Sequence, residues 1–213
     1  MTITVQICTV IVQVGTLLCV IDNLSPSQQA TRAKILEAAT GLFYHRGVHA
    51  VGVNEIAARA TASKLSLYRY FGSKDELVET TLRDHSDRIH AWIERKTRTA
   101  PAGDARVLSV FDLLIEWFAE AEYGGCAVIN TVTDMRADPA IAAIARQHLG
   151  RYRALLESRL REAGASNPAT LARQLLLLIE GASVISTIDG TAGSGADARD
   201  AAKQLLSAAR TKL

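Results

Sequence analysis

The first helical pattern in the chain lies between Thr31 and Arg46. Apolar side chains recur there every three or four residues, at Ile35, Leu36, Ala39, Leu42 and Phe43. This spacing places them on one face of an amphipathic helix. Thr31 has a side chain suited to capping the N-terminus of that helix, and Gly47 is suited to ending it.

Two shorter helical patterns follow, separated by a tight turn over residues 61–63. The first, over residues 53–60, has its apolar face at Ile56, Ala57 and Ala60. The second, over residues 64–71, has its apolar face at Leu67 and Phe71, which Leu65 or Tyr68 can extend. Helices of about two turns bury little surface alone, so the helix over residues 31–46 is expected to cover both.

From Leu77 to its end the chain also has helical patterns, without strand-like alternation or repeats. A capping box at Ser73-Lys-Asp-Glu76 opens the next helix, and Asp138-Pro139 and Asn167-Pro168 begin two others. The expected helices cover residues 77–98, 105–123, a short element opened by 124–130, then 139–163, 168–187 and 196–210. The predicted fold class is therefore all-α, with a three-helix domain over residues 25–76 and a helical domain over residues 77–213.

Residues 1–21 carry no charged side chain and have the length of a membrane span. However, Gln6 and Gln13 interrupt the segment, and no flanking Lys or Arg would set its orientation. It also lacks the basic start of a signal peptide. We therefore set residues 1–24 apart as an apolar N-terminal extension, and favour a translation start nearer Val20 or Leu24. The alternatives are a segment packed on the body or on a partner, and a membrane tether.

Basic side chains are concentrated in the predicted three-helix domain. Residues 32–74 contain seven Lys and Arg against two acidic side chains, whereas the whole chain has a formal net charge of +2. A basic surplus in one segment is typical of nucleic-acid binding. Because residues 64–71 also expose Lys, Ser, Tyr and Arg, the two short helices are interpreted as a helix-turn-helix that binds duplex DNA. An ordinary three-helix bundle with a solvated face is the alternative.

One run of residues resembles a known family signature. The residues are Ile56-Ala57, the run Ser63-Lys-Leu-Ser-Leu-Tyr-Arg-Tyr-Phe71, then Ser73-Lys74 and Leu77, and they resemble TetR-type transcriptional regulators. The motif covers residues 30–80, and the helical layout stays similar to the C-terminus. The chain departs from this signature at two positions. The turn has Thr61 where it usually has Gly, and the first short helix begins with Gly52 where it usually begins with Thr or Ser. A Thr at position 61 is strained if the turn needs a positive φ.

The resemblance implies a set of DNA contacts. Tyr68 and Lys74 match positions that hold backbone phosphates, which contribute affinity without sequence information. The residues expected to face the major groove are Lys64, Ser66, Arg69 and Tyr70, of which Tyr70 stands where many relatives have His. Lesser candidates for phosphate contact are Thr31, Asn54 and Ser63. For each of these residues, helix capping or packing is the alternative role.

The resemblance also implies that the second domain binds a small-molecule inducer between its middle helices. The candidate lining residues are Trp92, Phe111, Trp117, Phe118, Tyr123, Asn130, Met135, His148 and Tyr152. Ligand pockets are mostly apolar with a few convergent polar groups, and Asn130 and His148 are suited to that polar role. Each aromatic residue has plain core packing as its alternative. Ligand binding would favour a body conformation that moves the DNA-binding domains out of register.

The last two helices are expected to pair with their copies in a second subunit, as they do in relatives. Residues 175–179 are apolar on every side, which suits a helix buried on several faces. A two-fold pair of short recognition helices would read a palindromic operator. The alternative is that these residues fill the core of the monomer.

Motifs for enzymatic chemistry are absent from the sequence. It has no Gly-rich phosphate loop, no Gly-x-Ser-x-Gly elbow and no His-Glu-x-x-His, so no enzyme, cofactor or metal site is predicted. His85 and His90, five residues apart, are expected on different helix faces. Cys126 is the one cysteine outside the extension, which suits a reducing cytoplasm, and is interpreted as a small buried side chain with redox sensing as the alternative.

The predicted function is a cytoplasmic, ligand-responsive transcriptional repressor that binds its operator as a homodimer. A membrane is not an expected partner of this regulator. Two alternatives remain: a membrane-associated DNA-binding regulator, and a protein that binds DNA without sequence preference. The sequence names neither the inducer nor the operator.

Overall fold

The computed structural model describes residues 24–210, and the regular secondary structure of this part is entirely helical, as predicted. The helices are α2 (Pro26–Arg46), α3 (Val53–Arg59), α4 (Lys64–Phe71), α5 (Lys74–Thr97), α6 (Asp104–Phe118), α7 (Ala127–Asp134), α8 (Pro139–Glu162), α9 (Pro168–Asp189) and α10 (Gly193–Arg210). The apolar extension, and with it the start of translation, lies outside the described residues apart from Leu24.

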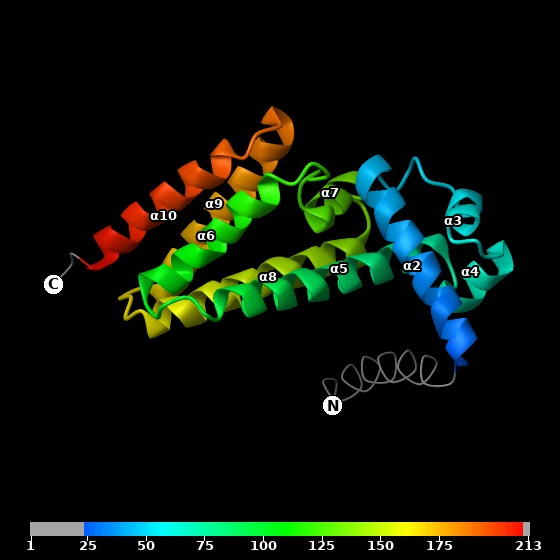
Figure 1. Ribbon diagram of the computed structural model, residues 1–213, viewed down its shortest axis with the longest axis horizontal. Coiled ribbons are helices and arrows are strands. Elements are labelled where there is room, and N and C mark those ends of the chain that lie inside the picture. Colours follow the sequence, from blue (N-terminus) through cyan, green and yellow to red (C-terminus); the bar gives the residue numbers. More distant parts are fainter. Residues whose placement is uncertain (1–23, 211–213) are drawn as a thin grey trace, which may run out of the picture.

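The helices form a small head and a longer body (Figure 1). Helices α2, α3 and α4 make the head at one end of the molecule. Helices α5 and α8 run side by side from the head along the body, where α6, α9 and α10 pack on one another and α6 and α9 also pack on α8. The short α7 lies beside α2, where it contacts α5 and α8. The head is therefore connected to the body both by the long α5 and by α7.

Helix α2 begins earlier than its apolar pattern predicts. Ser25 is its N-cap, with Pro26 in the first turn and a reciprocal capping box to Gln28. Thr31 lies inside the helix, where its hydroxyl donates to the carbonyl of Ser27 at 2.9 Å. The predicted N-cap at Thr31 is therefore wrong, because a capping box with proline upstream supplies a stronger start. The predicted end at Gly47 is confirmed, with a φ of 75° at that glycine.

The turn between α3 and α4 contains the position that the sequence marks as unusual. Thr61 has a φ of 50°, the one positive φ at a non-glycine among the described residues. A Thr side chain is strained in this conformation, since its branched Cβ meets the backbone. Gly52 acts as the N-cap of α3 without a side-chain hydrogen bond. Both departures from the expected motif are accommodated without loss of the helices.

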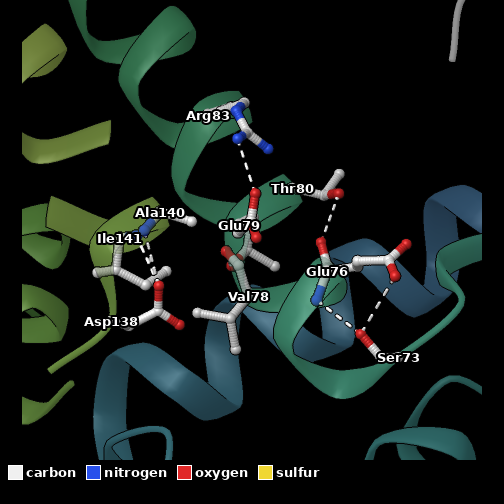
Figure 2. A network of polar contacts seen from close by, with 10 residues as sticks. Ser73, Glu76, Val78, Glu79, Thr80, Arg83, Asp138, Ala140 and Ile141 are labelled. Carbon is white, nitrogen blue, oxygen red and sulfur yellow. Dashed lines mark hydrogen bonds and ion pairs between the residues drawn. The ribbon is translucent and has the colours of Figure 1, made fainter. Parts of the chain in front are cut away.

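The N-termini of α5 and α8 are held by side-chain caps on either side of Val78, which is fully buried (Figure 2). The Ser73 hydroxyl accepts from the N–H of Glu76 at 3.0 Å, so α5 begins at Lys74 rather than at residue 77. The Asp138 carboxylate accepts from the N–H groups of residues 140 and 141 at 2.8 and 3.2 Å. These caps satisfy backbone donors that the helices leave unpaired.

Two apolar clusters hold the molecule together. The head cluster includes Ile35, Ile56 and Leu67, and it extends through Leu77 of α5 into Val128, Ile141 and Ile144 of α7 and α8. The body cluster is built from α5, α6, α8, α9 and α10 and includes Phe111, Leu156, Leu160, Leu175 and Leu206. The head therefore shares one apolar core with the start of α5 and with α7 and α8.

Helix α9 is the one described helix that is long and apolar enough to cross a membrane by length and composition. Its inner face belongs to the body cluster, through residues such as Leu171, Leu175 and Ile179. Core helices of soluble proteins commonly have this composition. The apolar character of α9 is therefore explained partly by the body core.

Candidate nucleic-acid interface and ligand cavities

Helix α4 turns one face to the head core and the opposite face outward. Leu67 and Phe71 are buried, and the residues about 180° away on the helix are Leu65 and Arg69. Leu65 is 69% exposed and Tyr68 is 40% exposed, so neither extends the apolar stripe as the sequence pattern predicted. The sequence already indicated this orientation, because residues one or two positions away from Leu67 lie on a different face of the helix. Leu65 is therefore an outward residue that the expected set of DNA contacts missed.

The polar residues of α4 fall into two groups. Lys64 and Arg69 are exposed, and the Lys64 ammonium lies 5.9 Å from the ring centroid of Tyr68. Ser63 caps the helix, since its hydroxyl accepts from the N–H of Ser66 at 3.0 Å and lies 2.9 Å from the Ser66 hydroxyl. Ser63 and Ser66 therefore have a structural role that is present without DNA.

The remaining expected DNA contacts lie in different settings. Tyr70 is half-buried and packs against the head cluster. Asn54 is exposed in the first turn of α3. Thr31 is half-buried on α2, with its hydroxyl hydrogen bonded to its own helix. Packing accounts for Tyr70 and Thr31 in the free protein, whereas Asn54 is accessible.

Lys74 connects α5 to the loop between α2 and α3. Its ammonium donates to the carbonyl oxygen of Val48 at 2.7 Å. The N–H of the same Val48 donates to a carboxylate oxygen of Asp134, at the end of α7, at 3.0 Å. Val48 is therefore held from both sides, by the start of α5 and by the end of α7. A lysine ammonium has three donors, so this bond leaves others for a phosphate.

The candidate ligand residues do not gather in one place. Four of them, Trp117, Phe118, His148 and Tyr152, line a small interior cavity of about 10 Å³. Tyr123 packs beside it, with its hydroxyl 2.7 Å from that of Ser183, and Trp92 contacts the ring of Trp117. The other three lie elsewhere: Phe111 in the body core, Met135 against the head cluster and Asn130 in a separate cleft.

The interior cavity has several buried ionisable groups. The His148 ring lies between the hydroxyl of Ser86, 2.8 Å from Nδ1, and the thiol of Cys126, 3.7 Å from Nε2. Burial lowers the pKa of His148 to about 3, so the imidazole is neutral. Burial raises the pKa of Glu180, which lines the same cavity, to about 7. The neutral imidazole can exchange hydrogen bonds with a ligand, and the Glu180 carboxyl is partly protonated near neutral pH.

The histidines meet in space despite their sequence spacing. The rings of His90 and His148 have centroids 4.8 Å apart, and His90 also packs on Tyr152 at 4.5 Å. The Nε2 atoms of His85 and His90 are buried without a hydrogen-bond partner in the described part of the chain. Within residues 24–210 no group of three His, Cys, Asp or Glu side chains is arranged to hold a metal ion.

Cys126 is a protonated thiol in this environment. Burial raises its pKa to about 12, and nearby Glu180 acts in the same direction. Reactive cysteines need a lowered pKa and access to solvent. Cys126 is half-buried, and its raised pKa favours a small packed side chain over a redox sensor.

A larger cleft of about 590 Å³ lies between α2, α5 and α7. Its apolar lining includes Phe43, Val48, Val78, Leu82, Ile129 and Val184. Asp134 and the residues around Val48 form one wall, so the cleft borders the contact between head and body. Its volume lies within the range of small-molecule sites.

Comparisons with known proteins agree with this geometry. Residues 35–81 match the family model of bacterial regulatory proteins of the tetR family. The HTH-type transcriptional activator FasR of Mycolicibacterium smegmatis is 31% identical over 112 residues, which are 53% of this chain and 50% of FasR. The HTH-type transcriptional regulator UidR of Escherichia coli is 25% identical over 142 residues, 67% of this chain and 70% of UidR.

Solved structures extend the similarity beyond the DNA-binding head. A TetR-family transcriptional regulator from Streptomyces coelicolor has a TM-score of 0.79 and 25% identity, covering 84% of this chain and 96% of that one. A tetr-transcriptional regulator from Streptomyces avermitilis has a TM-score of 0.67 and 29% identity, over 81% and 98% of the two chains. The likeness therefore includes the helical body.

Proposed function

Since this chain belongs to the TetR family of bacterial regulatory proteins and is a DNA-binding transcriptional regulator, not an enzyme, we propose that it is a ligand-responsive repressor. It acts in the cytoplasm, where it binds a palindromic operator as a homodimer. A small-molecule inducer releases it from that operator. The observation that carries this proposal is the outward face of α4, on which Lys64, Leu65 and Arg69 are exposed together.

The outward face of α4 is suited to reading a major groove. An arginine such as Arg69 donates two hydrogen bonds to guanine O6 and N7, and an apolar side chain such as Leu65 contacts the methyl group of thymine. Lys64 adds positive charge toward the phosphates. The head presents these side chains on a rigid helix, because Leu67 and Phe71 anchor the opposite face in the core.

Helix α9 supports the proposed dimer. Its exposed large apolar side chains, Leu177, Val184, Ile185 and Ile188, lie on one stripe of the helix, and Leu177 and Ile188 are 73% and 77% exposed. A contiguous apolar stripe of this kind is covered in a stable soluble protein. A second copy of α9 covers it in a two-fold arrangement, which also supplies two recognition helices for a palindrome.

The interior cavity supports the proposed inducer site. It is lined by Trp117, Phe118 and Tyr152 together with the polar His148 and Glu180. At about 10 Å³ it has room for about one water molecule, so an inducer must bind an expanded conformation. A ligand that binds only the expanded body shifts the population toward it, and the shared core carries that change to the head.

A binding selection from random duplexes tests the proposal, with the full chain at a stated salt concentration. An enriched palindrome bound about a thousandfold or more tighter than random duplex is expected. Equal affinity for all duplexes would replace the proposal with a nonspecific DNA-binding protein. Co-sedimentation of the chain with lipid vesicles would favour the membrane-associated alternative.

A further inference from the structure

The cleft between α2, α5 and α7 has no part in DNA reading or in the interior inducer site. It is distinct from the interior cavity, although His85 lines both. We propose that this cleft binds an amphipathic organic ammonium ion, and that this ligand releases the head from α7. The binding site stands on its own geometry, whereas the effect on DNA rests on the proposed function.

The hydroxyl groups of the cleft offer oxygen lone pairs and no hydrogens. Each lining threonine donates its hydroxyl hydrogen to a carbonyl of its own helix: Thr40 to Leu36, Thr81 to Val78, Thr131 to Ala127 and Thr133 to Ile129. The Tyr44 hydroxyl likewise donates to the carbonyl of Gly125, and its oxygen already accepts from the N–H of Gly124 at 2.6 Å. A hydroxyl has one hydrogen, so the threonine hydroxyls can only accept hydrogen bonds from a ligand.

The other polar groups of the cleft add further acceptors. Asn130 donates one of its two amide hydrogens to the carbonyl of Gly124 at 2.8 Å, and its side-chain oxygen can accept from a ligand. Asp134 contributes a carboxylate, and none of the lining residues is Lys or Arg. His85 adds a buried Nε2 without a partner in the described part of the chain, and burial lowers the pKa of this imidazole.

A ligand matched to this lining is a hydrogen-bond donor with a positive charge. A carboxylate or phosphate ligand would find no Lys or Arg among the lining residues and would face the Asp134 carboxylate. A protonated amine supplies up to three N–H donors to the oxygens of the cleft. The apolar lining, which includes Phe43, Val78, Leu82 and Ile129, accommodates an aliphatic or aromatic body.

The same carboxylate links the ligand to the head. Asp134 accepts the hydrogen bond from the N–H of Val48 at 3.0 Å, and the His49 ring lies 3.9 Å from its other oxygen. A charged donor forms a stronger bond to a carboxylate than a backbone N–H does. An ammonium group that binds the Asp134 carboxylate therefore draws it toward the cleft and weakens its bond to Val48, loosening the loop between α2 and α3. By linkage, the ligand then binds more tightly to protein that is free of operator.

Calorimetric titration of the full chain without DNA tests the site, using octylamine as the probe at pH 7. Octanol and octanoate have the same chain length and serve as neutral and anionic controls. Octylamine is expected to bind once per chain, about tenfold or more tighter than octanol, because one good charged contact is worth about that factor. Octanoate is expected to give no binding heat. Equal affinity for all three probes, or no binding of octylamine, would overturn the proposal without the use of any variant.

Two variants locate the ammonium group. Asp134→Asn keeps an oxygen for the Val48 N–H and removes the charge. This variant is expected to bind octylamine about tenfold more weakly than the wild-type chain does. Asp197→Asn removes a charge from the exposed surface of α10 and is the matched control, with unchanged affinity expected. A loss in Glu180→Gln without a loss in Asp134→Asn would place the probe in the interior cavity and overturn the proposal.

The DNA effect is measured separately on the selected operator. Octylamine is expected to weaken operator binding by the wild-type protein about tenfold, and to have a smaller effect on Asp134→Asn. If octylamine binds at Asp134 but the affinity for the operator is unchanged, the proposed release of the head is wrong, whereas the proposed binding site is retained. Failure to select any operator would count against the proposed function alone, since the titration needs no DNA.

Discussion

The ammonium of Lys74 donates to the carbonyl oxygen of Val48 at 2.7 Å, which joins the first residue of α5 to the loop after α2. Val48 is almost fully buried, so this carbonyl has little access to water. A lysine expected to bind phosphate therefore also stabilises the head. Both roles can be separated by measurement.

Replacing Lys74 by Met is expected to lower stability and DNA affinity together. The Val48 carbonyl loses its donor, and an unsatisfied buried acceptor costs about 1–3 kcal/mol of the free energy of unfolding. Affinity is expected to fall equally for all duplexes, with the salt slope reduced by about one unit. Denaturant unfolding and salt-dependent binding check the two effects. In the control Lys64→Met, the exposed side chain is expected to change stability by less than about 0.5 kcal/mol.

Arg69→Ala is expected to relax sequence preference more than it lowers general affinity. Loss of a bidentate contact to guanine removes about 1–3 kcal/mol of discrimination at one base pair. Competition binding with operators changed one pair at a time provides the measurement. A uniform loss across every operator would assign Arg69 to phosphate contact instead.

Leu65 is expected to contact a thymine methyl group, because it is the outward apolar residue of α4. Replacing thymine by uracil removes only that methyl, so one such replacement in the operator is expected to weaken wild-type binding about threefold to tenfold. The same replacement should have no effect on Leu65→Ala. Equal effects on both proteins would show that the methyl is read by another residue. The variant itself should keep its stability, since the side chain is 69% exposed.

Ile188→Glu is expected to disrupt the dimer. A carboxylate in place of the most exposed side chain of the apolar stripe of α9 must be desolvated when a second copy covers the stripe, which strongly disfavours association. Sedimentation should detect monomers at concentrations where the wild-type chain is dimeric, and operator affinity should fall with dimerisation. Ala154→Glu places the same charge on an exposed position of α8 and should leave the dimer intact. If the Ile188→Glu variant is still a dimer, the subunits associate through a face other than the apolar stripe of α9.

Glu180 is expected to make stability fall as the pH rises from about 4.5 to about 7. Its pKa is raised from 4.5 to about 7 in the folded chain, so between these values the folded state holds a proton that the unfolded state has lost. The free energy of unfolding then decreases with pH, and the effect is complete above the folded pKa. His148 and His90 have lowered pKa values and act in the opposite direction below pH 6.5.

The contribution of Glu180 can be isolated by comparison with Glu180→Gln. The stability of the variant relative to wild type is expected to increase between pH 5 and pH 7, because glutamine has no proton to lose. Denaturant unfolding at a series of pH values measures the difference. A difference that stays constant with pH would mean that the Glu180 carboxyl ionises as readily in the folded chain as in the unfolded one.

Features with local causes were determined by the sequence itself. The boundaries of α4 follow from the Ser63 cap and the glycine at position 72, and the buried pair Leu67 and Phe71 follows from helical spacing. The end of α2 at Gly47 has the same kind of cause. The start of α2 was also encoded locally, by Ser25 and the residues after it, but the apolar pattern that begins later suggested Thr31 instead. Capping residues and spacing act within a few positions, so they can be recognised without knowledge of the fold.

Contacts between distant segments were decided only by the tertiary structure. Val48 lies 26 residues from Lys74 and 86 from Asp134, and no pattern in the sequence joins them. The same is true of His148, Cys126 and Glu180, which meet because α7, α8 and α9 pack around one cavity. Which faces of these helices meet depends on how all their side chains interlock, a property of the whole core. The sequence by itself therefore determined the helices of the head, whereas packing decided which side chains line the two cavities and how the head is joined to the body.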